Sequence, residues 1–170
     1  MAYDYLIVGG GIVGISTAWQ LLQRYPNKRI LVLEKEFQYA GHQTGHNSGV
    51  IHAGVYYQPG SLKADFCRRG NEATIKFCLE HDIPYEQCGK LLVATDEVEF
   101  ERLAALEERC RQNGIATERL SEKDLAKREP HITGVGAIYV AATGITDYRR
   151  ITDRMAALFT AAGGEIQTGT

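Results

Sequence analysis

The sequence of 170 residues carries a formal net charge of −2, and no basic run is longer than a pair, which excludes an extended cationic surface for nucleic acid. Hydrophobic residues make up 44% and charged residues 24% of the chain, so a disordered chain is excluded as well. Ser16, Thr17 and Gln20 interrupt the longest apolar stretch, which falls short of the roughly 20 residues that a membrane span needs. We therefore expect a globular protein without a nucleic-acid partner.

Three elements follow one another at the start of the chain. The apolar runs Tyr3–Val8 and Ile30–Leu33 predict two buried parallel strands. Residues 12–24 between them have helical spacing, and Pro26 and Asn27 end the helix. The apolar residues expected to face the core are Val13, Ala18, Leu21 and Leu22. Strand, helix and strand in this order form a βαβ unit.

The segment from Phe37 to Gly60 has a different character. It is rich in glycine, histidine, asparagine and serine and has little periodicity, so it predicts a long loop. Such a loop inside a compact domain is usually functional or disordered. The apolar pair Val50-Ile51 favours an ordered loop.

Two longer helices are predicted after the loop. Ser61 can cap a helix that runs to about His81, and Asp96 can cap another that runs through Gln112. Residues 90–95 between them predict a strand. The apolar stripes of the two helices are Leu62, Phe66, Ala73 and Phe77 in the first, and Leu103, Leu106 and Cys110 in the second.

The last part of the chain alternates short elements. The segment SEKDLAKREP predicts a short helix that Pro130 ends, and glycines within residues 134–144 punctuate a pair of strands. Thr146 or Asp147 opens a final helix that stops at Gly163-Gly164, and EIQTG begins one more strand. A dinucleotide-binding sheet needs more strands than these. We therefore interpret the chain as the N-terminal portion of a longer protein whose C-terminal remainder is absent.

Compartment and redox state are indicated by the first residues and by the cysteines. The opening MAYDYLIV has no basic leader, and the four cysteines show no C-x-x-C spacing, which is typical of reduced thiols in a cytoplasmic protein. Cys67 and Cys78 lie eleven residues apart, on one face of a helix, so a redox pair or a metal site remains an alternative. Peripheral attachment at the inner membrane face also stays open.

Gly9, Gly11 and Gly14 form the pattern G-x-G-x-x-G between the first strand and the first helix. The first glycine permits a tight turn, the second lets the backbone approach a pyrophosphate, and the third allows close packing of helix on strand. Ile12 and Val13 belong to the first helical turn, where free N–H groups and the positive end of the helix dipole attract phosphate. The pattern therefore predicts a dinucleotide site.

Glu34 lies twenty residues after Gly14, at the end of the second strand, with Lys35 beside it. A carboxylate there can accept both hydroxyls of an adenosine ribose, and its charge disfavours a 2′-phosphate. The pattern does not separate NAD from FAD, and a glycine turn that binds nothing is a further alternative. Two features favour FAD: the turn lies within ten residues of the N-terminus, and a long loop follows the second strand.

These residues resemble a known family. Asp4–Glu34 is similar to the ADP-binding fingerprint of the D-amino-acid-oxidase-like FAD-dependent oxidoreductases. The more specific block HQTGHNSGVIHAGVYYQPGSLKA, residues 42–64, resembles the L-2-hydroxyglutarate oxidase/dehydrogenase branch of that family. The shorter segments CGKLLVAT, REPHITGVGAIYV and GGEI fit the same branch, so the resemblance covers the whole chain.

The resemblance implies FAD as the cofactor and an α/β fold. The expected architecture is a Rossmann-like FAD-binding βαβ sheet with inserted α+β segments, belonging to an incomplete two-domain flavoprotein oxidoreductase. Residues 1–50 and 145–170 would form the FAD-binding portion. Residues 51–144 would be inserted segments that lead toward the substrate domain.

For the glycine-rich loop, the resemblance implies contact with the cofactor. The residues that would supply hydrogen bonds or close backbone approach are Thr44, Asn47, Ser48 and Gly49. His46 and His52 would lie nearest the flavin and are the candidate catalytic bases, although either could instead orient the loop. His42 and His46 have i, i+4 spacing, but the loop context argues against a metal site, and we expect none.

The implied reaction is the oxidation of L-2-hydroxyglutarate, a small 2-hydroxy dicarboxylate, to 2-oxoglutarate. Its C2 hydrogen leaves as hydride to flavin N5 while a base takes the hydroxyl proton, and the electrons then pass to oxygen or to a membrane quinone. Three alternatives remain open at this point. They are a relative of the same fold acting on glycerol 3-phosphate or an amino acid, a non-catalytic truncated nucleotide-binding remnant, and a nicotinamide-dependent dehydrogenase.

Overall fold

The fold is described by a computed structural model of residues 2–170, which divides into two compact units. Unit 1 comprises the described residues up to Gly49, together with Glu80–Ile83 and Asp147–Thr170. Unit 2 comprises Val50–Leu79 and Pro84–Thr146. The assignment of these units to cofactor and substrate remains a prediction.

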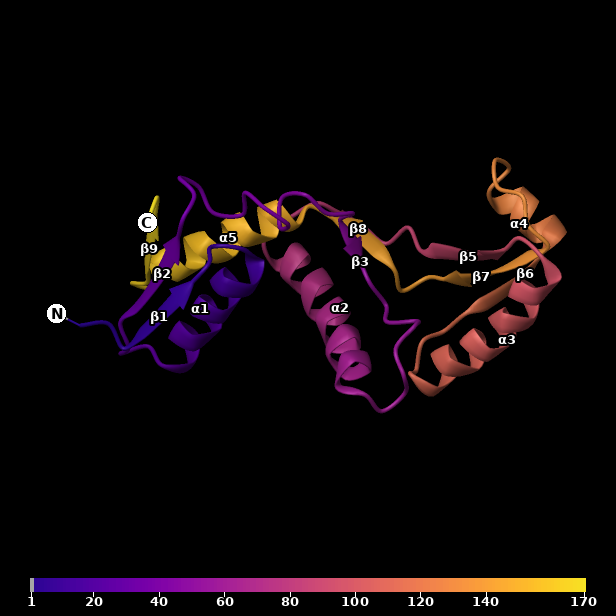
Figure 1. Cartoon of the computed structure of the whole chain (residues 1–170), viewed down its shortest axis with the longest axis horizontal. Coiled ribbons are helices and arrows are strands. Elements are labelled where there is room, and N and C mark those ends of the chain that lie inside the picture. Colours follow the sequence, from indigo (N-terminus) through magenta and orange to yellow (C-terminus); the bar gives the residue numbers. More distant parts are fainter. Residues whose placement is uncertain (1) are drawn as a thin grey trace. The chain divides into compact units, whose positions relative to one another are not determined.

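Unit 1 is built on a parallel sheet in the strand order β1-β2-β9 (Figure 1). Its elements are β1 (Tyr5–Val8), α1 (Ile12–Arg24), β2 (Ile30–Glu34), α5 (Tyr148–Ala161) and β9 (Glu165–Thr168). Apolar side chains of both helices and of β2 form one core that includes Ile15, Ala18, Val32 and Phe159. The predicted βαβ unit and the α/β class are therefore confirmed.

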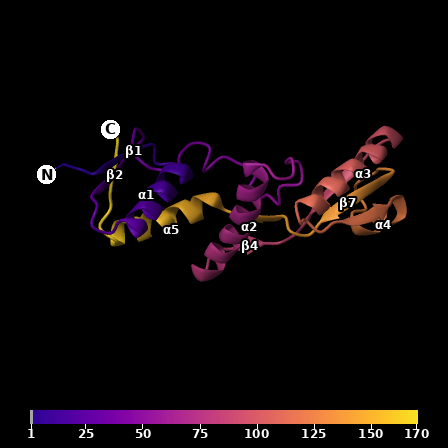
Figure 2. The same cartoon turned by 90° about the horizontal axis from the view of Figure 1, so that it is seen from below.

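Unit 2 contains two antiparallel sheets, in the orders β3-β8-β4 and β5-β7-β6. Figure 2 shows α3 and α4 beside β7. The elements of the unit are β3 (Val50–Ile51), α2 (Leu62–Glu80, whose last residue belongs to unit 1), β4 (Tyr85–Glu86), β5 (Lys90–Ala94), α3 (Glu97–Gln112), β6 (Glu118–Ser121), α4 (Glu122–Arg128), β7 (Gly136–Val140) and β8 (Gly144–Thr146).

The two faces of the β5-β7-β6 sheet carry separate apolar clusters. Leu92 and Ile138 pack with Leu103 and Cys110 of α3, while Ala137 packs with α4 through a second cluster. Successive side chains of a strand point to opposite faces of the sheet, so the neighbours Ala137 and Ile138 belong to different clusters. The stripe predicted for α3 is confirmed, because Leu103 and Cys110 are buried and Leu106 packs against them.

Other expectations from the sequence were wrong. The first strand was expected to be buried, but three of the four residues of β1 are exposed, and β1 lies at the edge of its sheet. Val13 is 77% exposed, because it lies on the side of α1 that turns away from the α1–α5 core. On α2 the stripe is buried only at Phe77, whereas Leu62 and Phe66 are 72% and 60% exposed. The strands within residues 134–144 do not pair with each other: β7 pairs with β5 and β6, and β8 pairs with β3 and β4. Short strands β4 and β6 were not predicted.

Phe159 is fully buried in unit 1, and a Cβ atom on Gly164 would overlap its ring. We expect Phe159→Ala to lower the free energy of unfolding by about 3–5 kcal/mol, because it leaves a cavity in a packed core. Urea unfolding followed by circular dichroism measures this change. Phe37→Ala is the matched control, since Phe37 is 93% exposed. Equal losses in the two variants would contradict the assigned core.

Candidate functional site

The turn between β1 and α1 is held in a shape that requires glycine. Gly9 has a φ of +109°, and its N–H donates to the Leu33 carbonyl at 2.8 Å. A Cβ atom on Gly14 would overlap the carbonyl oxygen of Gly9. The first and third glycines of the pattern therefore have the roles expected from the sequence, a tight turn and close packing.

Glu34 fastens this turn to the end of β2. One of its carboxylate oxygens accepts the Gly10 N–H at 2.7 Å, and the other accepts the Glu36 N–H at 3.0 Å. The side chain is buried, with 9% of the residue exposed. Hydrogen bonds from the backbone of Glu36 and of Gly10 lower the pKa of Glu34 because they stabilise the carboxylate. Glu34 is therefore ionised at neutral pH.

Gly10 belongs to the same turn, and the spacing pattern treats it as a variable position. A Cβ atom there would lie 2.8 Å from the Tyr39 Cβ and 3.0 Å from a Glu34 carboxylate oxygen. No side chain fits without displacing one of them. The run of three glycines at residues 9–11 was the available signal.

Thr44 attaches the glycine-rich loop to the same turn. Its hydroxyl oxygen accepts the N–H of Ile12, the first residue of α1, at 3.0 Å. Gly11, the residue before the helix, has no side chain that could cap it. A hydroxyl from 32 residues downstream thus satisfies one of the free N–H groups of the helix start.

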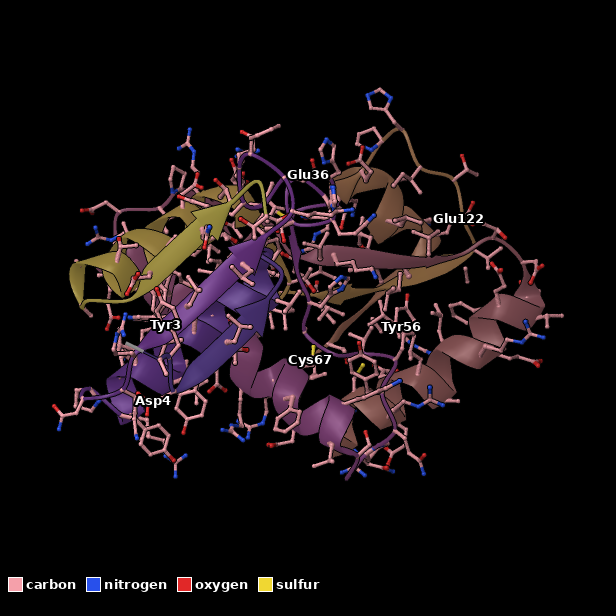
Figure 3. The ribbon with its side chains drawn as sticks, turned by 60° about the vertical axis from the view of Figure 1, so that its left-hand side comes forward. Tyr3, Asp4, Glu36, Tyr56, Cys67 and Glu122 are labelled. Atoms are coloured by element: carbon pink, nitrogen blue, oxygen red, sulfur yellow. The ribbon has the colours of Figure 1, made fainter. Side chains whose placement is uncertain are left out.

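A cavity of about 440 Å³ opens beside these residues, within the size range of small-molecule sites. Five predicted cofactor residues line it: Gly9, Gly11, Glu34, Lys35 and Thr44. The lining is completed by residues that were not predicted to contact the cofactor, and they are Val8, Leu33, Glu36, Ala40, Gly41, His42, Gln43 and Thr170. Figure 3 shows Glu36 labelled on the chain that leaves β2.

The remaining predicted cofactor residues lie outside this lining. Ile12, Val13 and Gly14 form the first turn of α1. Asn47 shapes the loop, because its amide donates to the carbonyls of Gln43 and Thr44 while its oxygen accepts the Gly49 N–H. Ser48 lies exposed between them, and Gly49 has a φ of +69°.

The two candidate bases belong to different units. His46 is exposed in unit 1, and its Nδ1 lies 3.0 Å from the His42 carbonyl, so the tautomer with a proton on Nδ1 can donate to it. His52 is exposed in unit 2 and lines a second cavity together with Lys90. His42 contacts Glu36, with Nε2 and Oε1 3.1 Å apart. Among residues 2–170, no group of side chains forms a candidate metal site.

The geometry of unit 1 fits the ADP half of a dinucleotide. Gly9 and Gly11 line the cavity next to the start of α1, where the N–H groups of the helix favour a pyrophosphate. Each Glu34 oxygen accepts one backbone N–H and keeps a second lone pair, which is available to a ribose hydroxyl. FAD therefore fits the residues present at this site.

Comparison with known proteins points to the same chemistry. The sequence model of the family "FAD dependent oxidoreductase" matches residues 4–170. The chain is 59% identical to an L-2-hydroxyglutarate dehydrogenase of Escherichia coli O17:K52:H18, over 96% of this chain and 39% of the relative. It is 48% identical to the mitochondrial L-2-hydroxyglutarate dehydrogenase of Homo sapiens, over 98% of this chain and 36% of the relative. The chain thus spans less than half the length of these curated relatives.

Solved structures share the fold. The dithionite-reduced L-alpha-glycerophosphate oxidase from Mycoplasma pneumoniae, with FAD bound, superposes with a TM-score of 0.92 at 28% identity, covering 100% of this chain and 46% of that one. Glycine oxidase from Geobacillus kaustophilus matches in fold alone, with a TM-score of 0.85 at 20% identity, over 98% and 46% of the two chains. None of the helices described for residues 2–170 has the length and the hydropathy of a transmembrane span.

Replacing Gly10 with alanine should weaken FAD binding about tenfold or more, because the new Cβ displaces Tyr39 or the Glu34 carboxylate. Fluorescence titration of the apoprotein with FAD measures the effect. Gly70→Ala on α2 is the control, since a Cβ there meets no atom within 4 Å. Unchanged FAD affinity in the Gly10 variant would show that the turn is not part of the site.

The lowered pKa of Glu34 predicts a pH dependence of stability. A carboxyl group with a depressed pKa in the folded state stabilises the fold above its unfolded-state pKa, near the ordinary 4.5, and loses this contribution as the pH falls through the folded-state value. The difference in free energy of unfolding between the wild type and Glu34→Gln should therefore be largest above pH 4.5 and shrink below it. Urea denaturation at a series of pH values measures it. A difference that grows on acidification contradicts the assignment.

Proposed function

Because the chain belongs to the FAD dependent oxidoreductase family, we propose that the whole protein oxidises L-2-hydroxyglutarate to 2-oxoglutarate with FAD as its cofactor. The observation that carries the proposal is the likeness to L-2-hydroxyglutarate dehydrogenases from a bacterium and from a mammal. The identities, 59% and 48%, extend over nearly the whole chain. The cavity of unit 1 supports the cofactor part of the proposal.

In this proposal, unit 1 holds the adenine-bearing half of the cofactor. The Glu34 carboxylate accepts hydrogen bonds from the ribose, and the free N–H groups at the start of α1 bind the pyrophosphate. Thr44 keeps the glycine-rich loop against the turn, and Lys35 lies at the cavity wall. Asn47, Ser48 and Gly49 remain proposed cofactor contacts. When bound, FAD supplies the acceptor for the hydride that leaves substrate C2.

The chain itself must supply a base for the substrate hydroxyl proton. A neutral imidazole can take this proton, and the proposed bases are His46 and His52. With Nδ1 of His46 facing the His42 carbonyl, Nε2 is the nitrogen left to accept a proton. His52 shares its cavity with the cationic Lys90.

A second candidate substrate is glycerol 3-phosphate. It is supported by the TM-score of 0.92 to an L-alpha-glycerophosphate oxidase, although the identity of 28% is about half that to the dehydrogenases. An amino-acid substrate has the weaker support of fold likeness alone.

The proposed electron acceptors are oxygen and a membrane quinone. To reduce a membrane quinone, a cytoplasmic protein would have to associate with the inner membrane face.

The test is anaerobic reduction of the flavin in the native-length protein. L-2-hydroxyglutarate should bleach the flavin absorbance, whereas glycerol 3-phosphate and glycine should not. The variants His46→Asn and His52→Asn are compared in the same assay. The variant that lacks the catalytic base should bleach about a hundredfold more slowly or worse, since general-base catalysis contributes about 10²–10⁴-fold.

His131→Asn is the control variant, because His131 is an exposed loop residue outside the proposed site. A flavin that glycerol 3-phosphate bleaches in preference to L-2-hydroxyglutarate would select the second candidate. Full flavin loading without reduction by any of these substrates would identify a non-catalytic nucleotide-binding protein. Subsequent admission of oxygen or of a quinone analogue shows which acceptor restores the absorbance.

A further inference from the structure

Unit 2 contains a small cavity of its own, of about 130 Å³. Its polar side chains come from three separate segments: His52, Tyr56 and Tyr57 from the loop after β3, Lys90 from the start of β5, and Thr143 from the turn before β8. Ala53 and Val55, which belong to the buried apolar cluster of this unit, form its floor. The cavity therefore combines a fixed apolar base with several convergent polar groups.

Lys90 gives the cavity a positive charge that the described part of the chain does not neutralise. Its Nζ lies 3.5 Å from the Tyr56 hydroxyl and 5.0 Å from the centre of the same ring. No carboxylate among residues 2–170 forms an ion pair with it. A half-buried ammonium group beside a phenol favours an anion as its ligand.

Thr143 is a second polar residue in the lining of this cavity. The residue is only 4% exposed and lines the cavity. Its hydroxyl forms no hydrogen bond with any side chain or backbone group of residues 2–170. No buried side-chain oxygen of the described residues lacks a hydrogen-bond partner, so the Thr143 hydroxyl is an accessible group that can donate to a ligand in the cavity. The backbone carbonyl of Thr143 accepts the Gly89 N–H at 2.9 Å, which fixes Thr143 beside Lys90.

The loop that carries His52 and the two tyrosines is held by side chains of two helices. On α2, Cys67 and Asn71 donate to the His52 carbonyl, at 3.4 Å and 3.2 Å. The amide of Asn71 also donates to the Ala142 carbonyl at 2.9 Å, which ties the loop to the turn that bears Thr143. Figure 3 labels Cys67 on α2 and Tyr56 on this loop.

Arg109 in the last turn of α3 and Asn113, the residue that caps this helix, hold the other end of the loop. Arg109 donates to the Tyr56 carbonyl at 3.3 Å, and Asn113 donates to the Tyr57 carbonyl at 2.9 Å. The loop that carries His52, Tyr56 and Tyr57 is held at both ends without a ligand. Ligand binding therefore costs little conformational entropy in this loop. These contacts belong to a preformed site.

We propose that this cavity binds a carboxylate group of the small dicarboxylate substrate, with Lys90 as the counter-charge and the hydroxyls of Tyr56 and Thr143 as hydrogen-bond donors. The inference rests on the proposed function for the identity of the ligand. A carboxylate matches the single positive charge and the two hydroxyl donors, and a cavity of about 130 Å³ excludes a large anion such as a nucleotide.

Glutarate is the probe, because it carries both carboxylates but has no hydroxyl to oxidise. Calorimetric titration of the FAD-loaded native-length protein measures its dissociation constant. Lys90→Met keeps most of the side-chain length without the charge and should raise this constant about tenfold or more. Lys90→Arg should stay within about threefold of the wild type, and Thr143→Val should raise the constant about threefold. The KM for L-2-hydroxyglutarate should rise in the same order, with flavin content unchanged.

Lys63→Met is the matched control, since it removes the same charge from the exposed surface of α2. Glutarate that fails to bind the wild type, or binds Lys90→Met as tightly, overturns the inference. Inorganic phosphate that binds more tightly than glutarate and depends on Lys90 also overturns it, in favour of a phosphate site. Lys90-dependent glutarate binding without bleaching by L-2-hydroxyglutarate supports the carboxylate site and contradicts only the proposed function.

Discussion

The carboxylate of Glu34 joins the two chain segments on which the proposed cofactor site depends. It accepts the Gly10 N–H from the first βα turn and the Glu36 N–H from the segment after β2. Because both hydrogen bonds favour the ionised form, a negative charge stands at this wall of the cavity at neutral pH. A ribose with free hydroxyls is a suitable partner for that charge, whereas a ribose 2′-phosphate would be repelled.

A second hydrogen bond joins the start of α1 to a residue that is distant in the sequence. Thr44 binds the N–H of Ile12, so the glycine-rich loop forms a wall of the same cavity. Within that loop, Asn47 accepts the Gly49 N–H and donates to two carbonyls, which gives the loop order without regular secondary structure. The residues of the glycine-rich loop thus have two roles. Thr44 lines the cavity, and Asn47 holds the loop in place.

The parts that the sequence predicted well were those determined by local chemistry. The helix Ile12–Arg24 has the predicted bounds, and Asp96 and Asp147 cap α3 and α5. Partners across long sequence separations could not be predicted. No periodicity indicates that Thr44 caps α1, that β7 and β8 join different sheets, or that Phe66 lies on an exposed part of α2. These features depend on tertiary packing, which a single sequence does not specify.

The most direct test is a structure of the native-length protein with FAD bound. The account predicts that a Glu34 carboxylate oxygen lies within hydrogen-bond distance, about 2.5–3.0 Å, of a ribose hydroxyl while both backbone N–H contacts are kept. The pyrophosphate should lie at the start of α1. A cofactor whose ribose contacts other residues and leaves the cavity beside Glu34 filled with water would contradict the account.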